Sequence, residues 1–200
     1  NMPHMPTTGV SGLDLYAYDT VNKEWKWAYG NYDFSDTISY TWKNIGRNGK
    51  FNYRLYLPLY NTVKWLKIGV PNTAKLTYTH TTAAKPIVVY GTSIGQGACT
   101  SRPGLAWTNQ VGRAFDHEMI NLCFSGNGRL EQPILNVMNS VDAACYVLDC
   151  IPNLAISKSL TEEQLDSLLV NAVTFLRKEH PTTPIILTQH SSGSIAEVFN

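Results

Sequence analysis

The sequence predicts an α/β protein in which an antiparallel β-sandwich or jelly roll precedes a domain built on a parallel sheet. Apolar and polar residues alternate with period two up to about residue 82, whereas continuous apolar runs and helical patterns alternate after it. The chain has 200 residues, of which 44% are hydrophobic, and this is enough to fill such cores. We therefore expect a β-sandwich domain at 1–82 and an α/β domain at 83–200.

Short alternating runs separated by turn residues predict the strands of the first half. They lie at residues 13–18, 37–42, 51–59, 66–70 and 76–78. Turn signals such as Gly30-Asn31 and Asn48-Gly49 separate the runs, a spacing typical of a sandwich or jelly roll. Pro58 lies inside the third run and predicts an edge strand or a bulge, because proline cannot donate to the strand ladder.

Continuous apolar runs predict buried parallel strands in the second half. They lie at residues 87–90, 119–122, 143–148 and 185–187. The best helical pattern is 161–179, where apolar residues form one stripe from Leu165 to Leu176. Thr161 and Gln164 predict a capping box at its start, and Pro181 predicts its end. This alternation of strands and helices predicts βαβ units with right-handed crossovers.

Composition excludes several classes of function. The 16 Lys+Arg and 15 Asp+Glu give a net charge of +1, which provides no electrostatic attraction to nucleic acid. No apolar run is long enough for a membrane span. The 4 cysteines form no Cys-x-x-Cys pair and have no histidine at zinc-finger spacing. We expect buried free thiols and no metal site.

The loops that follow the predicted parallel strands are the candidate ligand sites, because ligands bind at the carboxyl ends of such strands. Residues 91–97 form a glycine-rich loop, which could cradle a phosphate. Its spacing matches neither a dinucleotide fingerprint nor a Walker loop. Alternatively, Ser93 is a nucleophile at the end of the strand. The commoner role for a single serine is to hydrogen-bond nearby backbone in a turn.

Two further loops favour the nucleophile interpretation. Gly126 and Asn153 follow the next two predicted strands, and Gly126 can offer a closely approached backbone N–H while Asn153 can donate its side-chain amide. Acyl transfer requires a nucleophile together with donors directed at the developing oxyanion. Three such residues after successive parallel strands predict this chemistry better than any one alone.

These loops resemble those of the SGNH hydrolase superfamily, the GDSL-type esterases and lipases, at residues 91–97, 125–127 and 152–153. Three positions depart from the usual blocks, where Thr92 replaces Asp, Cys150 replaces Gly and Leu154 replaces Asp. Residues 12–16 match in full the Gly-x-Asp-Leu-Tyr signature of a bacterial subgroup that carries an N-terminal β-sandwich. The resemblance covers most of the chain, and its motifs are specific in combination.

The resemblance implies a three-layer, flavodoxin-like domain and a serine esterase that needs no metal or cofactor. Ser93 would be the nucleophile, and its own N–H, Gly126 and Asn153 would form the oxyanion hole. The substrates would be acyl or acetyl esters, many of them on carbohydrates, and the location periplasmic or secreted. Arg102 and Trp107 follow the nucleophile loop and are expected to line the cleft, although a plain surface role for Arg102 stays open.

A catalytic base is the missing part of this interpretation. The family carries it in an Asp-x-x-His block, which this sequence lacks, so we expect the chain to be a fragment of a longer enzyme. His190 follows the fourth predicted strand and is a candidate substitute, with a wall residue of the cleft as its alternative role. The alternative function is a non-catalytic carbohydrate-binding module with a degenerate hydrolase domain. A nucleotide-binding protein ranks third.

Overall fold

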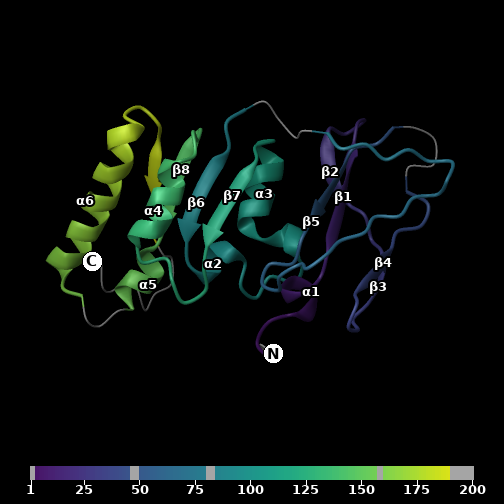
Figure 1. Cartoon of the computed structure of the whole chain (residues 1–200), viewed down its shortest axis with the longest axis horizontal. Helices are drawn as coiled ribbons and strands as arrows, with labels where there is room; N and C mark the ends of the chain where they lie inside the picture. The colour runs from purple at the N-terminus through teal and green to yellow at the C-terminus, as the bar shows by residue number, and fades with distance from the viewer. Residues whose placement is uncertain (1–2, 46–49, 80–83, 157–159, 190–200) are drawn as a thin grey trace. The chain divides into compact units, whose positions relative to one another are not determined.

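The structure is a computed structural model and describes residues 3–45, 50–79, 84–156 and 160–189 (Figure 1). The chain forms two compact units. The first comprises Asn1–Thr79 and Gly97–Arg113, and the second comprises His80–Gln96 and Ala114–Asn200. The N-terminal unit therefore takes up a segment from the second half of the sequence. The hydropathy pattern of the sequence gives no sign that this segment belongs to the N-terminal unit.

Two small antiparallel sheets form the strands of the N-terminal unit. The first has the order β2-β1-β5 and consists of β1 (Asp14–Asp19), β2 (Glu24–Trp27) and β5 (Tyr53–Tyr56); β3 (Asn31–Asp33) pairs with β4 (Ser39–Thr41) in the second. The strands predicted from the runs that begin at residues 13, 37 and 51 are confirmed; β4 and β5 are shorter than their runs, whereas β1 extends to Asp19. β5 is an edge strand that ends two residues before Pro58, as this proline requires.

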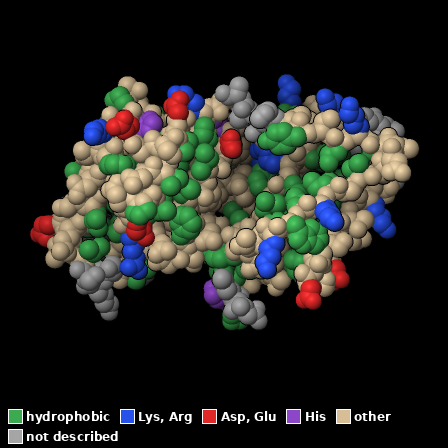
Figure 2. Space-filling view, viewed as in Figure 1, with side chains coloured by type: hydrophobic (Ala, Val, Ile, Leu, Met, Phe, Trp, Pro, Cys, Tyr) green, Lys and Arg blue, Asp and Glu red, His purple; other side chains and the backbone are tan. Residues whose placement is uncertain are grey.

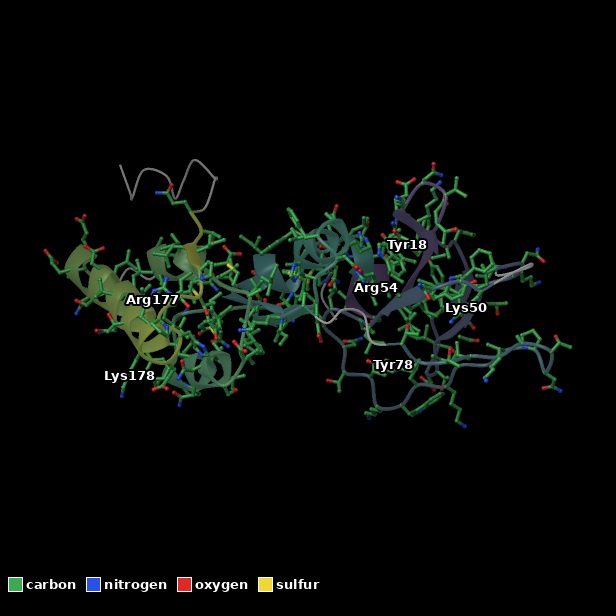
Figure 3. All side chains as sticks on the ribbon, turned by 90° about the horizontal axis from the view of Figure 1, so that it is seen from above. Tyr18, Lys50, Arg54, Tyr78, Arg177 and Lys178 are labelled. Atoms are coloured by element: carbon green, nitrogen blue, oxygen red, sulfur yellow. The ribbon has the colours of Figure 1, made fainter. Side chains whose placement is uncertain are left out.

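Aromatic and cationic side chains cover part of the three-stranded sheet. The Arg54 guanidinium carbon lies 4.5 Å from the centroid of the Trp25 ring, and the Tyr18 ring meets the same indole at 5.2 Å. Figure 3 shows Tyr18 and Arg54 on β1 and β5. Such contacts stabilise a half-exposed sheet face, because a cation is attracted to the face of an indole.

The strands predicted at 66–70 and 76–78 are wrong, since the structure has no strand between residues 57 and 79. The apolar residues that produced the alternation are exposed, and they include Leu66, Ile68, Val70, Leu76 and Tyr78. Figure 2 shows hydrophobic side chains at the surface of this half of the chain. Alternation supplies one apolar face but no neighbour for backbone pairing, and a strand needs both.

The second unit is built on a parallel sheet of order β7-β6-β8-β9. Its strands are β6 (Ile87–Gly91), β7 (Met119–Cys123), β8 (Cys145–Asp149) and β9 (Ile185–Leu187). All four predicted runs are confirmed. In the register of the sheet, Gly91 at the end of β6 lies opposite Cys123 on one side and Asp149 on the other. The three strands therefore end at the same level, and the loops that follow them start side by side.

Three helices pack against this sheet and enclose the hydrophobic core (Figure 1). They are α4 (Gln132–Asn139), α5 (Ile151–Ala155) and α6 (Glu162–Glu179). The core residues include Val88, Tyr90, Met138, Tyr146, Leu148, Leu154 and Leu176, all at most 2% exposed. The capping box predicted at Thr161 is confirmed, because Gln164 N–H donates to its hydroxyl at 3.3 Å and Gln164 Oε1 accepts its N–H at 2.9 Å.

Side chains near the end of α6 stabilise its last turn. Arg177 Nη1 donates to the carbonyl of His180 at 3.1 Å, and Figure 3 shows Arg177 beside Lys178 on this helix. Cations at this position oppose the negative end of the helix dipole.

The remaining short helices are α1 (Thr7–Val10), α2 (Ser93–Gln96), the 3₁₀ helix η1 (Pro103–Leu105) and α3 (Trp107–Ala114). None of the helices in the described ranges is long and apolar enough to cross a membrane.

Candidate active site

Ser93 begins helix α2, two residues after the end of β6, and is half-buried. The turn is closed locally, because Thr92 Oγ1 accepts the N–H of Ile94 at 3.4 Å and the Thr92 carbonyl accepts that of Gln96 at 3.1 Å. A Cβ on Gly95 would lie 2.4 Å from Cys123 Sγ. Glycine is therefore required there, and it lets α2 sit directly against the end of β7.

The loop after β7 carries Gly126 and is hydrogen-bonded to residues on either side of Ser93 in the sequence. Phe124 N–H donates to the Gly91 carbonyl at 3.0 Å, and Ser125 N–H donates to Gln96 Oε1 at 2.7 Å. Gly126 has a φ of +78°, which a residue with a side chain adopts only with strain, and a Cβ there would meet open space. The exposed turn can thus present backbone N–H groups to a ligand.

Asn153 lies on α5, after the end of β8, and reaches the same turn. Its Nδ2 donates to the carbonyl of Asn127, which directly follows Gly126. One hydrogen bond that Gln96 accepts and one that Asn153 donates therefore link the three loops. The structure brings together the loops that carry Ser93, Gly126 and Asn153, and the catalytic roles of these residues stay predictions.

The three departures from the family pattern are all buried. Thr92 and Cys150 are 0% exposed and Leu154 is 2% exposed. Thr92 closes the nucleophile turn through its hydroxyl, whereas Leu154 belongs to the hydrophobic core and the Cys150 thiol donates to the Tyr90 carbonyl at 3.6 Å. The three side chains thus lie in the packing beneath the loops, and none of them is a predicted oxyanion donor.

Asp149 places a buried carboxylate at the end of β8, where it accepts a hydrogen bond from Thr188 Oγ1 at 2.6 Å. Burial raises the pKa of the Cys123 thiol, and it raises the pKa of Cys150 to about 12, with the charge of Asp149 acting in the same direction. Both thiols are neutral at physiological pH and are poor nucleophiles. No group of His, Cys, Asp and Glu in the described part of the chain is placed to hold a metal ion.

The cysteines are free thiols, as the sequence predicts, but Cys99 is exposed rather than buried. Its Sγ lies 3.7 Å from the carbonyl of His4 in the N-terminal unit. Cys99 is in the segment that this unit takes from the second half of the sequence, and it follows a turn rather than a strand. Cys99 does not lie in an apolar strand run, so the sequence pattern gives no reason to expect that it is buried.

The described histidines of the second unit lie far along the sheet from Ser93. His117 Nδ1 is 3.1 Å from the carbonyl of Lys85, and His180 Nε2 is 2.9 Å from that of Asn139. Both precede parallel strands and thus lie toward the amino edge, whereas Ser93 is at the carboxyl edge. His190 is outside the described residues, and its role as base stays a prediction.

Arg102 belongs to the N-terminal unit, where its Nε lies 3.1 Å from Asp14 Oδ2 and its Nη2 donates to the Tyr16 hydroxyl at 3.1 Å. Burial raises the pKa of Asp14, and the positive charge of Arg102 partly offsets this effect. Trp107 begins α3 and is half-buried. The predicted substrate-lining roles of Arg102 and Trp107 remain untested, although Arg102 is more than a plain surface residue.

Sequence reasoning missed two polar residues that position the loops. Asn121, in the middle of β7, donates from Nδ2 to the Gly95 carbonyl at 2.8 Å and accepts the N–H of Cys123 at 2.9 Å. Gln96 holds the loop after β7, as described above. The sequence gives no signal for Asn121, because this residue is an exposed position of the edge strand β7, where an amide needs no protein partner.

Comparisons with protein families match both halves of the chain. Residues 84–200 match the GDSL-like lipase/acylhydrolase family, and residues 1–76 match the family described as the N-terminus of SGNH-hydrolase-type esterases. A search of curated proteins found no match.

Solved structures give the same fold. A protein from Bacteroides ovatus ATCC 8483, described as a GDSL-like lipase, is 35% identical with a TM-score of 0.81 over 94% of this chain and 53% of its own. Salicylyl-acyltransferase SsfX3 from a tetracycline biosynthetic pathway is 17% identical with a TM-score of 0.63, covering 92% of this chain and 50% of its own. The chain thus spans about half the length of both neighbours.

Proposed function

Since the chain belongs to the GDSL-like lipase/acylhydrolase family, we propose that it carries the nucleophile and oxyanion donors of a serine esterase. In this proposal Ser93 attacks acyl esters, acetyl esters among them. The complete enzyme would be correspondingly longer than this chain, as are the two solved neighbours. The observation that carries the proposal is the hydrogen-bonded linkage of the three loops through Gln96 and Asn153.

The proposed reaction proceeds through an acyl-enzyme. Ser93 Oγ attacks the carbonyl carbon of the ester while its proton passes to a base, and the carbonyl oxygen becomes an oxyanion. The backbone N–H groups of Ser93 and Gly126 and the amide of Asn153 donate to that oxyanion. The alcohol leaves with the proton from the base. Water then attacks the carbonyl carbon of the acyl-enzyme while the base takes one of its protons. The bond to Ser93 Oγ breaks, the base gives this proton to Oγ, and the acyl group leaves as a carboxylic acid.

The base in this proposal is a histidine of the complete enzyme. Neither His117 nor His180 is suitable, because both lie toward the opposite edge of the sheet. His190 follows β9 by three residues in the sequence and is the candidate within this chain. Replacing it with alanine tests that assignment directly. Retained ester hydrolysis by the variant would move the role to a histidine elsewhere in the complete enzyme.

Carbohydrate esters are the proposed substrate class, and a periplasmic or secreted location is proposed from family resemblance. The N-terminal unit exposes aromatic rings, among them Tyr29 at 69% and Tyr32 at 44%. An exposed ring offers an apolar face with a polar edge, which suits the face of a sugar. The same rings favour the alternative function, a carbohydrate-binding module without catalysis.

Active-site labelling distinguishes the two functions. The complete enzyme is treated with a fluorophosphonate and assayed with p-nitrophenyl acetate and an acetylated oligosaccharide. We expect label on Ser93, and loss of both label and hydrolysis in Ser93→Ala. The matched control is Ser167→Ala on the exposed face of α6, which should retain both. Hydrolysis by Ser93→Ala would overturn the assignment. Oligosaccharide binding by an unlabelled wild type would establish the binding module instead.

A further inference from the structure

The Gly-x-Asp-Leu-Tyr signature at residues 12–16 encloses a buried carboxylate that has partners from a distant part of the sequence. Asp14 begins β1 and is 2% exposed. Its Oδ2 accepts a hydrogen bond from Arg102 Nε at 3.1 Å and from the backbone N–H of Gly104 at 2.9 Å. A buried carboxylate is tolerated only with such partners. The signature and the segment around Arg102 therefore require each other.

Three side chains of the N-terminal unit hold the guanidinium of Arg102. Besides the contact with Asp14, Nη2 donates to the Tyr16 hydroxyl at 3.1 Å, and the guanidinium carbon lies 3.9 Å from the centroid of the Trp27 ring. Only arginine combines a planar fork of donors with a face that stacks on an indole. The contact set fixes both the position and the orientation of this side chain.

The backbone around Arg102 is in equally close contact with the signature and with α1. A Cβ on Gly104 would lie 2.3 Å from a ring carbon of Tyr16 and 2.7 Å from Asp14 Oδ2. A Cβ on Gly9 would lie 2.0 Å from the carbonyl oxygen of Thr100. Real Cβ atoms do not approach other atoms this closely, so both positions need glycine. Residues 100–104 thus lie directly on α1 and β1.

Arg113, at the other end of the same segment, contacts the aromatic ring of Tyr16. The guanidinium carbon of Arg113 lies 4.0 Å from the centroid of the Tyr16 ring and 5.3 Å from that of Tyr56. Tyr16 therefore binds Arg102 through its hydroxyl and Arg113 through its ring. One signature residue fixes both ends of the stretch from 102 to 113.

We propose that Asp14 and Tyr16 are positioning residues, which hold residues 97–106 and through them fix the nucleophile turn. The connection is covalent, because Gly97 directly follows Gln96, the last residue of α2. The N-terminal unit is then required for the reactivity of Ser93 rather than being only an attached binding module. The part that concerns reactivity rests on the proposed function, whereas the holding of the segment does not.

Hydrogen exchange tests the holding of the segment without any assay of activity. Asp14→Asn in this chain should speed exchange of the amides of Gly104 to Ala106 by at least tenfold, with a smaller acceleration at Gln96. The matched control is Asp19→Asn, because Asp19 lies on the same strand and pairs at the surface with Lys26 at 2.9 Å. It should leave exchange in 93–106 unchanged. Unchanged exchange in a folded Asp14→Asn variant would overturn the proposal.

A milder variant covers the case in which Asp14→Asn does not fold. Arg102→Lys keeps the charge but loses the second donor to Tyr16 and the stacking on Trp27, so it should speed exchange of residues 100–106 by several fold. Circular dichroism and the melting temperature establish that each variant is folded. Exchange in Arg102→Lys equal to that of the wild type would also contradict the proposal.

The rate of fluorophosphonate labelling at Ser93 tests the effect on reactivity in the complete enzyme. Asp14→Asn should lower this rate and kcat for ester hydrolysis about tenfold while KM stays within twofold, because the binding groups are not altered. Faster exchange with an unchanged labelling rate would overturn the positioning role. An unlabelled wild type would refute the proposed function instead, and the exchange result would still decide whether the signature holds the segment.

Discussion

Asn153 Nδ2 donates a hydrogen bond to the backbone carbonyl of Asn127, and this bond joins α5 to the turn that contains Gly126. A side-chain amide has two N–H groups, so one can orient the amide while the other donates to a ligand. The bond thus fixes the direction of a proposed oxyanion donor before any substrate binds. Such preorganisation is the main source of electrostatic catalysis in acyl transfer.

Asn153→Ala should lower kcat of the complete enzyme on the order of a hundredfold, because it removes one oxyanion donor. KM should change little, since the donor acts mainly on charge that develops in the transition state. Steady-state kinetics with p-nitrophenyl acetate checks this. The control is Asn136→Ala on the exposed face of α4, which should have wild-type kinetics. An unchanged kcat in Asn153→Ala would exclude the donor role.

Gly128→Ala should destabilise the protein more than Gly126→Ala. Both glycines have positive φ, +75° and +78°, so alanine costs about 1–2 kcal/mol of backbone strain at either position. Only at Gly128 would the new Cβ also collide with backbone, 2.4 Å from the Gly91 carbonyl oxygen. Urea unfolding of the two variants measures the difference. Equal losses would mean that the turn shifts to accommodate the methyl group.

Stability should fall as pH rises above about 9, because of buried thiols. The ordinary thiol pKa is 9.0, whereas burial raises the pKa of Cys150 to about 12 in the folded protein, and that of Cys123 is raised in the same direction. Between these values the unfolded chain has lost the proton that the folded chain keeps, so unfolding becomes more favourable with increasing pH.

Urea midpoints at pH 7.5, 9.0 and 10.5 under reducing conditions measure this effect. Cys150→Ala should flatten the pH dependence even though it lowers stability at every pH by creating a cavity. Cys99→Ala is the control, because Cys99 is exposed, and its pH dependence should match that of the wild type. A slope in Cys150→Ala identical to that of the wild type would show that this thiol does not contribute.

Thr161→Ala should cost about 1 kcal/mol of stability, because it removes the hydroxyl that caps the first turn of α6. Ser167→Ala is the matched control on the same helix. Its hydroxyl bonds to the Glu163 carbonyl at 2.7 Å within the helix, and alanine is the better helix former, so stability should stay equal or rise slightly. Thermal unfolding separates the two. A loss in Ser167→Ala as large as that in Thr161→Ala would remove the cap as the cause.

The second half of the fold was predictable because all four of its strands appear as continuous apolar runs, which become β6 to β9. Such runs are typical of strands that are buried on both faces, as β6 and β8 are, whereas β7 and β9 are partly exposed. The first half was less predictable, since its strands are three to six residues long and lie between exposed segments. The runs at 66–70 and 76–78 form no strand, because an alternating pattern predicts one apolar face but does not show whether a neighbouring strand is present to pair with it.

The loops of the candidate site were predictable for a similar reason. Parallel strands end at one edge, so residues that follow them in sequence are neighbours in space. This rule placed the loops of Ser93, Gly126 and Asn153 together, whereas it could not anticipate Asn121 or Gln96, which orient those loops. Their partners depend on how each loop closes, and loop closure is set by tertiary contacts.

By itself the sequence determined the class of fold, the positions of the parallel strands and of the loops that follow them, and the start of α6 at Thr161. These features depend on periodicity and on local capping, which act over a few residues. Only the tertiary structure decided that residues 97–113 join the N-terminal unit and that Asp14 receives Arg102. Those residues are 88 positions apart, and a buried ion pair over such a separation leaves no local pattern in the sequence.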